Sequence, residues 1–167
     1  ITNACGGTST FSGVISGGGT FIKNGAGALT LSATNTMTGG VTLNAGTLNI
    51  ADAQALGTVA GTFAITGGTF DNTTGGALST LNYPQTWNGN FTFTGTDNLD
   101  LGTGAVTIGG ASQITTSTAG KTLTVDGIIS GGFLLTKAGA GALTLGGNNT
   151  MTGGVTLSAG VLQIEHA

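Results

Sequence analysis

The sequence contains a long internal duplication without gaps. Residues 1–50 align with residues 115–164 at a constant offset of 114, and 30 of the 50 aligned positions are identical. Self-similarity of this kind is typical of solenoids, in which each repeat stacks on the next. We therefore expect a single domain over 1–167, made of one module at 1–114 and a partial copy at 115–167.

Apolar residues recur in pairs separated by one residue, and the intervening residue is mostly threonine. This period of two places each pair on one face of a β-strand and the threonine on the other face. The pattern predicts parallel strands with their leucine, valine and isoleucine side chains pointing inward. These strands are expected at 29–31, 41–43, 48–50, 143–145, 155–157 and 162–164.

Glycine supplies 34 of the 167 residues and separates the expected strands. Glycine disfavours helix and adopts the positive φ that tight corners need. The spacing between strands is irregular, which suits a coil with corners of unequal length better than a series of two-residue hairpins. The sequence therefore predicts an all-β fold, a right-handed parallel β-helix with about eight rungs of roughly 20 residues, ~40 Å long.

The charge pattern argues against several classes of protein. The basic residues are Lys23, Lys121 and Lys137, and there is no arginine. Three lysines do not make a patch that neutralises phosphates, so no nucleic-acid partner is expected. No apolar run reaches the ~18 residues of a membrane-spanning helix. Cys5 is the single cysteine, which precludes an internal disulfide, and Ile1 begins mid-pattern, as in a mature or excised segment.

The duplicated segment resembles the passenger-associated transport repeat, also called the autotransporter-associated β-strand repeat. In the first copy the resemblance rests on 25–31, 35–40 and 44–48. The second copy matches at 139–145, 149–154 and 159–162. Residues 51–114 resemble the looser spacer between such repeats.

One position departs from the family pattern. The residue between the two threonines of the centre is usually aromatic in the family, but here it is Met37 or Met151. We expect this difference to change the packing locally and to leave the fold intact. The resemblance implies a bacterial β-helix that is secreted or displayed at the cell surface. It implies no enzyme activity, because the repeat is a stalk element that carries many different tips.

Catalytic and metal sites find little support among the residues. Asp97 and Asp100 are the best pair of carboxylates, but three positions apart on an extended chain they point to opposite faces. One cysteine and one histidine, His166, do not make a zinc site, and the aspartate of calcium-binding β-roll repeats is missing. We therefore expect neither catalysis nor a cofactor.

Two sets of residues are structural or contact candidates. Turns and side-chain ladders are expected at Asn35, Gly39, Gly40, Asn149, Gly153 and Gly154. We expect Tyr83 and Trp87, beside Pro84, to lie in a loop, where they form a candidate aromatic patch for a sugar or a peptide. Three Asn-Xaa-Thr sequons begin at Asn72, Asn90 and Asn148.

Three functions are compatible with these observations. The first is a non-catalytic, adhesin-type or stalk-type module that spaces or displays parts at the bacterial surface. The second is an extracellular filament subunit that stacks end to end, and the third is a polysaccharide lyase or hydrolase. The expected partners are other copies or adjoining repeats of the same protein, through end-to-end stacking, and a glycan or host surface.

Overall fold

The chain folds into a succession of short β-strands. The computed structural model describes residues 1–166, and within these residues it contains strands and no helix. No segment of this described part therefore forms a helix able to cross a membrane. The strands are β1 (Thr2–Asn3), β2 (Ser9–Phe11), β3 (Phe21–Lys23), β4 (Ala28–Leu31), β5 (Val41–Leu43), β6 (Thr47–Ile50), β7 (Phe63–Ile65), β8 (Thr69–Asn72), β9 (Leu78–Ser79), β10 (Gln85–Trp87), β11 (Phe91–Phe93), β12 (Leu99–Asp100), β13 (Val106–Ile108), β14 (Ser112–Thr116), β15 (Thr122–Val125), β16 (Ile129–Ser130), β17 (Leu135–Ala138), β18 (Ala142–Leu145), β19 (Val155–Leu157) and β20 (Val161–Ile164).

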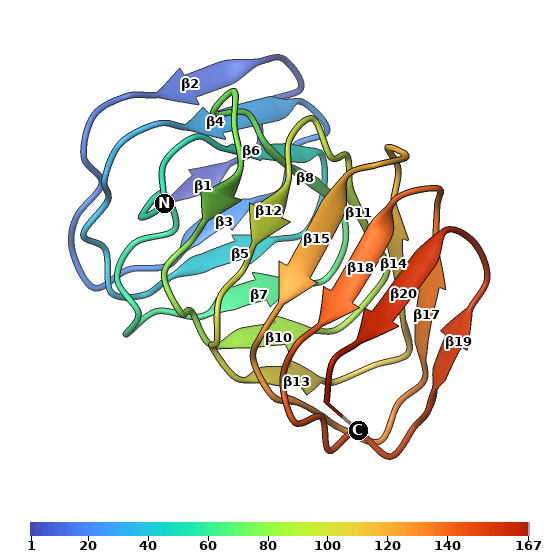
Figure 1. Ribbon diagram of the computed structural model, residues 1–167. Coiled ribbons are helices and arrows are strands. Elements are labelled where there is room, and N and C mark those ends of the chain that lie inside the picture. Colours follow the sequence, from blue (N-terminus) through green and yellow to red (C-terminus); the bar gives the residue numbers. More distant parts are fainter. Residues whose placement is uncertain (167) are drawn as a thin grey trace.

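The strands form three parallel sheets that wind around one axis. Sheet A has the order β1-β3-β5-β7-β10-β13-β16, sheet B has the order β2-β4-β6-β8-β11-β14-β17-β19, and sheet C has the order β9-β12-β15-β18-β20. Since sheet B receives one strand from each turn, the parallel β-helix has eight turns. The N-terminal turns (blue) and the C-terminal turns (red) lie at opposite ends of the stack (Figure 1).

Turn length varies along the solenoid. Ala142 lies opposite Val161 on the next turn, whereas Leu99 lies opposite Leu123, so the turn that begins at Leu99 is the longer of the two. The strands stay in register because the extra residues are accommodated in the corners. The lengths of the corners therefore determine the angular position of each segment around the axis.

The interior is a continuous column of apolar side chains. Alternate residues of β4, β5 and β6 are buried, and the residues between them are partly exposed. Phe70 and the aromatic residues of the following turn, Phe91 and Phe93, pack with ring centroids 5.7 Å apart. Burial of this apolar surface drives the stacking, because a single turn has no partner for its inward face.

The six strands predicted from the sequence are present and parallel. Inward burial is confirmed for the pairs at 29–31, 41–43, 48–50 and 143–145. In the last turn, β19 and β20 pair in parallel as expected, but the inward residues Leu157 and Ile164 are about half exposed. No later turn covers them among the described residues, so inward burial does not extend to this turn.

The two copies of the repeat lie on different sides of the β-helix. In the first copy β3 and β5 belong to sheet A, whereas their counterparts β17 and β19 belong to sheet B. Five turns along sheet A carry the chain from Ile22 to Ser130. The counterpart of Ile22 in the second copy is Thr136, which lies beyond Ser130 on sheet B. The module thus spans five turns and about one third of a turn.

Candidate functional site

The carboxylates that the sequence singled out take part in structural contacts. Asp97 lies between β11 and β12, and its Oδ1 is 3.1 Å from Nζ of Lys121 on the following turn. Asp100 lies on β12, and its Oδ1 accepts a hydrogen bond of 2.7 Å from the N–H of Gly102. One carboxylate therefore joins two turns, and the other stabilises a corner.

Asp71 is a carboxylate that the sequence did not single out. It is 5% exposed and accepts hydrogen bonds from the N–H groups of Gly95 and Thr96, at 3.1 and 2.9 Å, and from the Thr96 hydroxyl. The period of two placed Asp71 on the outer face, next to the inward Phe70. The loop of the following turn folds over it, a long-range contact that the local sequence does not encode.

A second group of acidic residues follows the outer face of sheet C. Burial raises the pKa of Asp126, and the charges of Asp100 and Glu165 on other turns raise it further. These like charges repel one another across the turns. Among residues 1–166, no set of three or more histidine, cysteine, aspartate or glutamate side chains is grouped closely enough to hold a metal ion.

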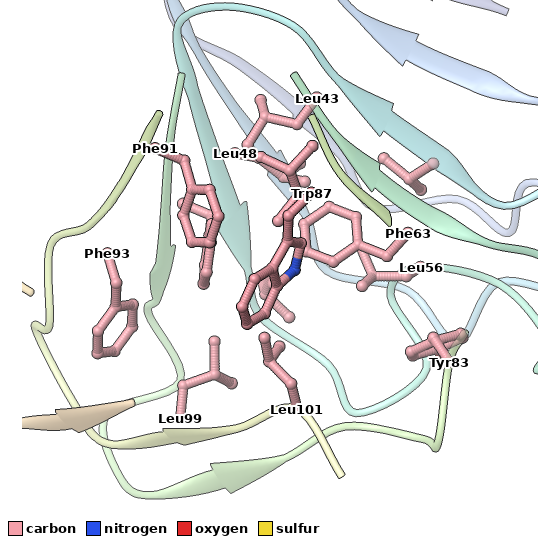
Figure 2. Packing of buried hydrophobic residues seen from close by; sticks show 14 of the residues in the cluster. Leu43, Leu48, Leu56, Phe63, Tyr83, Trp87, Phe91, Phe93, Leu99 and Leu101 are labelled. Atoms are coloured by element: carbon pink, nitrogen blue, oxygen red, sulfur yellow. The ribbon is translucent and has the colours of Figure 1, made fainter. Parts of the chain in front are cut away.

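The aromatic patch predicted at Tyr83 and Trp87 does not lie on the surface. Tyr83 is 2% exposed and Trp87 is fully buried, so neither ring faces a ligand (Figure 2). The Tyr83 hydroxyl donates a hydrogen bond of 2.8 Å to the carbonyl of Gly57, and Trp87 packs edge-on against Phe91 at 5.4 Å. The prediction was wrong because Trp87 belongs to β10, where the period of two points it inward.

Asn35 and Asn149 bridge turns through their side-chain amides. Oδ1 of Asn35 accepts from the N–H of Ile15, at 2.8 Å, and Nδ2 donates to the carbonyl of Ala55, at 2.6 Å. Asn35 therefore joins three successive turns from a fully buried position. Oδ1 of Asn149 accepts from the N–H of Ile129 in the same way, at 2.9 Å.

Three of the four glycines of the repeat centre, Gly39, Gly40 and Gly153, lie at close crossings of the main chain. Gly40 and Gly154 have φ of 71° and 82°, in the left-handed region that favours glycine. A Cβ on Gly39 would collide with the main chain of Gly19, and one on Gly153 would collide with that of Phe133. Gly39, Gly40 and Gly153 thus let successive turns approach at the corner, whereas Gly154 faces open space.

The sequons and the cysteine differ in accessibility. The side chain of Asn72 is fully buried, and its Nδ2 donates to the carbonyls of Gly76 and Asn98, both at 2.7 Å. A glycan would not reach this amide in the folded protein. Asn90 and Asn148 are exposed, as is the free thiol of Cys5.

Two buried lysines are the functional groups that the sequence analysis missed. Lys23 and Lys137 are both completely enclosed, and they are equivalent in the two copies of the repeat. The period of two contained a usable signal, since each lysine follows an inward residue by two positions, Phe21 or Leu135. Lysine as a residue type suggested an exposed side chain, whereas its position in the strand indicated a side chain that points into the interior.

These features define a parallel β-helix, two parts of which match the passenger-associated transport repeat. The signature of that repeat matches residues 21–50 and 135–164, and the chain therefore carries two copies of it. The chain is also 35% identical over 166 residues to the adhesin BmaC autotransporter of Brucella suis biovar 1 (strain 1330). The match covers 97% of this chain and 4% of that relative's length. No solved structure matches the chain significantly.

Proposed function

We propose that the chain is a non-catalytic structural module of the adhesin or stalk type, which spaces or displays other parts outside a bacterial cell. The observation that carries this proposal is the uninterrupted stack. Sheets of seven and eight parallel strands run along a filled apolar interior. Each internal turn is bonded to both neighbours by main-chain hydrogen bonds, which makes the stack a stiff rod.

The outer faces of the sheets suit an aqueous environment. Outward positions such as Thr42, Thr92 and Thr107 alternate with buried apolar ones along their strands. Threonine favours strand conformation, and its hydroxyl remains available to water or to a partner. The rod therefore gains length with each repeat while its surface stays polar.

The comparisons support an extracellular location and an adhesin-like role. The repeat takes its name from passenger transport, and the relative is named as an autotransporter adhesin. Since this chain corresponds to 4% of that relative, adhesion by the whole protein is not by itself a property of this segment. We propose spacing and display for the segment, with a glycan or host surface as the contact of the larger protein.

A distance measurement between the two ends tests the spacer role. Cys5 in the first turn is exposed, and Ser158→Cys adds a second exposed thiol in the last turn. Spin labels on these thiols are expected to give one narrow distance distribution at about 35–40 Å, from seven turns at ~4.8 Å each plus the lateral offset. A broad distribution, or a separation well below this, would show that the chain is not a stiff spacer.

An activity measurement tests the absence of catalysis. We expect no turnover of uronate polymers or other polysaccharides by the purified chain. Turnover that disappears in Asp97→Ala or Asp100→Ala would assign the chain to the lyases or hydrolases instead.

The exposed apolar residues of the last turn favour end-to-end association as a second candidate function. Leu157 and Ile164, which point toward the interior column, are each about half exposed on β19 and β20. Strand edges with apolar side chains readily pair with another chain. Light scattering and electron microscopy over a concentration series would detect filaments of the isolated chain, whereas a strictly monomeric particle would exclude them.

A further inference from the structure

Two lysines lie in the interior of the β-helix, where an ammonium group is normally costly. Lys23 on β3 and Lys137 on β17 are fully buried. A charged group in the interior persists only when its hydrogen bonds are satisfied. The structure supplies partners from the main chain rather than from carboxylates.

The ammonium of Lys137 is held by carbonyls of two turns. Nζ donates to the carbonyls of Ala138 and Gly139, at 2.7 and 3.0 Å, and to that of Ala159 on the following turn, at 3.1 Å. The three donors of an ammonium group thus have three acceptors. The carbonyl of Lys137 in turn accepts from the N–H groups of Ser158 and Ala159, which closes the contact between the turns.

Lys23 repeats this arrangement in the first copy. Its Nζ donates to the carbonyl of Gly25 on its own turn and to that of Ala45 on the next, the latter at 3.2 Å. Its own carbonyl accepts from the N–H groups of Asn44 and Ala45. Both sites therefore pair a lysine with an alanine carbonyl of the following turn, at the same sequence separation.

The glycine that directly follows each of these alanines makes room for the site. Gly46 and Gly160 have φ of 72° and 74°. A Cβ on Gly46 would lie 2.5 Å from Nζ of Lys23, and one on Gly160 would lie 2.9 Å from Nζ of Lys137. Both would also collide with main-chain carbonyls of the preceding turn. The lysine and the glycine therefore form one unit across two turns.

The two sites lie on different sides of the solenoid, since β3 belongs to sheet A and β17 to sheet B. We propose that each repeat contains an internal site for a primary ammonium group, built from main-chain carbonyls of two successive turns, and that Lys23 and Lys137 fill these sites to fix the register between those turns. A slip by one residue would remove the carbonyl of the next turn from the ammonium group and turn the inward side chains outward. Burial lowers the pKa of both lysines, which is the direction expected for enclosed amino groups. For Lys23, the nearby Cys5 shifts the pKa in the opposite direction.

Chemical rescue tests the site. Lys23→Ala removes three methylenes and the ammonium, which is the size of propylammonium. We expect the Lys23→Ala variant to unfold at a lower temperature than the unchanged chain. Added propylammonium should raise the melting midpoint of this variant until the site is saturated. Tetramethylammonium at equal concentration has the charge but no N–H donor, and it should not raise the midpoint. Equal effects of the two cations, or no effect of either, would overturn the proposal.

The matched control is Lys121→Ala. This lysine pairs with Asp97, and its side chain is 35% exposed, so it has no internal carbonyl site. The melting midpoint of the Lys121→Ala variant should therefore respond equally to propylammonium and to tetramethylammonium. A selective rescue of Lys121→Ala by propylammonium would also count against the proposal.

A second variant keeps the proposal testable if Lys23→Ala does not fold. Lys23→Met preserves an unbranched side chain and removes the donors. We expect the N–H groups of Asn44 and Ala45 to exchange with solvent at least tenfold faster than in the unchanged chain. Unchanged protection would reject the register role of Lys23. The end-to-end distance of the rod is a separate readout, so that result would leave the spacer function standing.

Discussion

Trp87 lies at the centre of the column, and its removal should be the most damaging single truncation. Trp87→Ala deletes a fully buried side chain from β10, in the fifth of eight turns. The substitution removes about 150 Å² of buried apolar area, which at about 25 cal/mol per Å² corresponds to about 4 kcal/mol. The edge-on contact with Phe91 and the hydrogen bond from Nε1 to Oε1 of Gln85 are lost as well.

Urea denaturation is the assay for this prediction. We expect the free energy of unfolding to fall by about 3–5 kcal/mol, the range typical of buried tryptophan truncations. Because each turn contacts only its neighbours, the damage should separate the two halves of the rod and lower the apparent cooperativity. Thr86→Ala, on the partly exposed face of the same strand, is the control and should change stability by less than about 0.5 kcal/mol.

A loss below about 1 kcal/mol for Trp87→Ala would contradict the reasoning, since buried large-to-small changes normally cost more. It would mean that the column collapses around the cavity or that Trp87 contributes little to stacking. Hydrogen exchange would then show whether the amides of β7 and β13, the neighbours of β10 in sheet A, keep their protection.

Three further predictions use matched positions. Asn35→Ala should lower the free energy of unfolding in urea by about 2 kcal/mol, and Asn149→Ala by about half as much. The reason is that the Asn35 side chain bonds to the turns on both sides, whereas that of Asn149 bonds to one. Equal losses in the two variants would contradict this reasoning. Gly46→Ala should lower the melting midpoint far more than Gly120→Ala, since both have positive φ but only Gly46 faces main-chain atoms; similar losses would leave strain as the sole cause. Burial, with the charge of Asp52, raises the pKa of Tyr83. The phenol of the folded protein therefore keeps its proton above pH ~10, where the phenol of the unfolded chain loses it. The stability that Tyr83 provides is complete below pH ~10 and declines above it. The stability difference between the unchanged chain and Tyr83→Phe should therefore shrink from pH 9 to 11.5, and a constant difference would refute the pKa direction.

Local pattern was enough to predict the strands and their inward faces. The apolar alternation of β4, β5 and β6 is a property of a few neighbouring residues, and a single turn cannot bury that face alone. Parallel stacking of similar turns follows from these two facts. The same pattern, applied to Trp87, would have placed it in the core, but its position next to Pro84 favoured the loop interpretation.

The tertiary structure alone decided where each segment lies around the axis. The two copies are identical at 30 of 50 aligned positions, yet they occupy different sheets, because the angular position depends on the summed lengths of all intervening corners. Turns of unequal length accumulate an offset of about a third of a turn between one copy and the next. The enclosure of Asp71 and the carbonyl sites of Lys23 and Lys137 have the same origin. They arise from atoms that are distant along the chain and come together only when one turn is laid on the next.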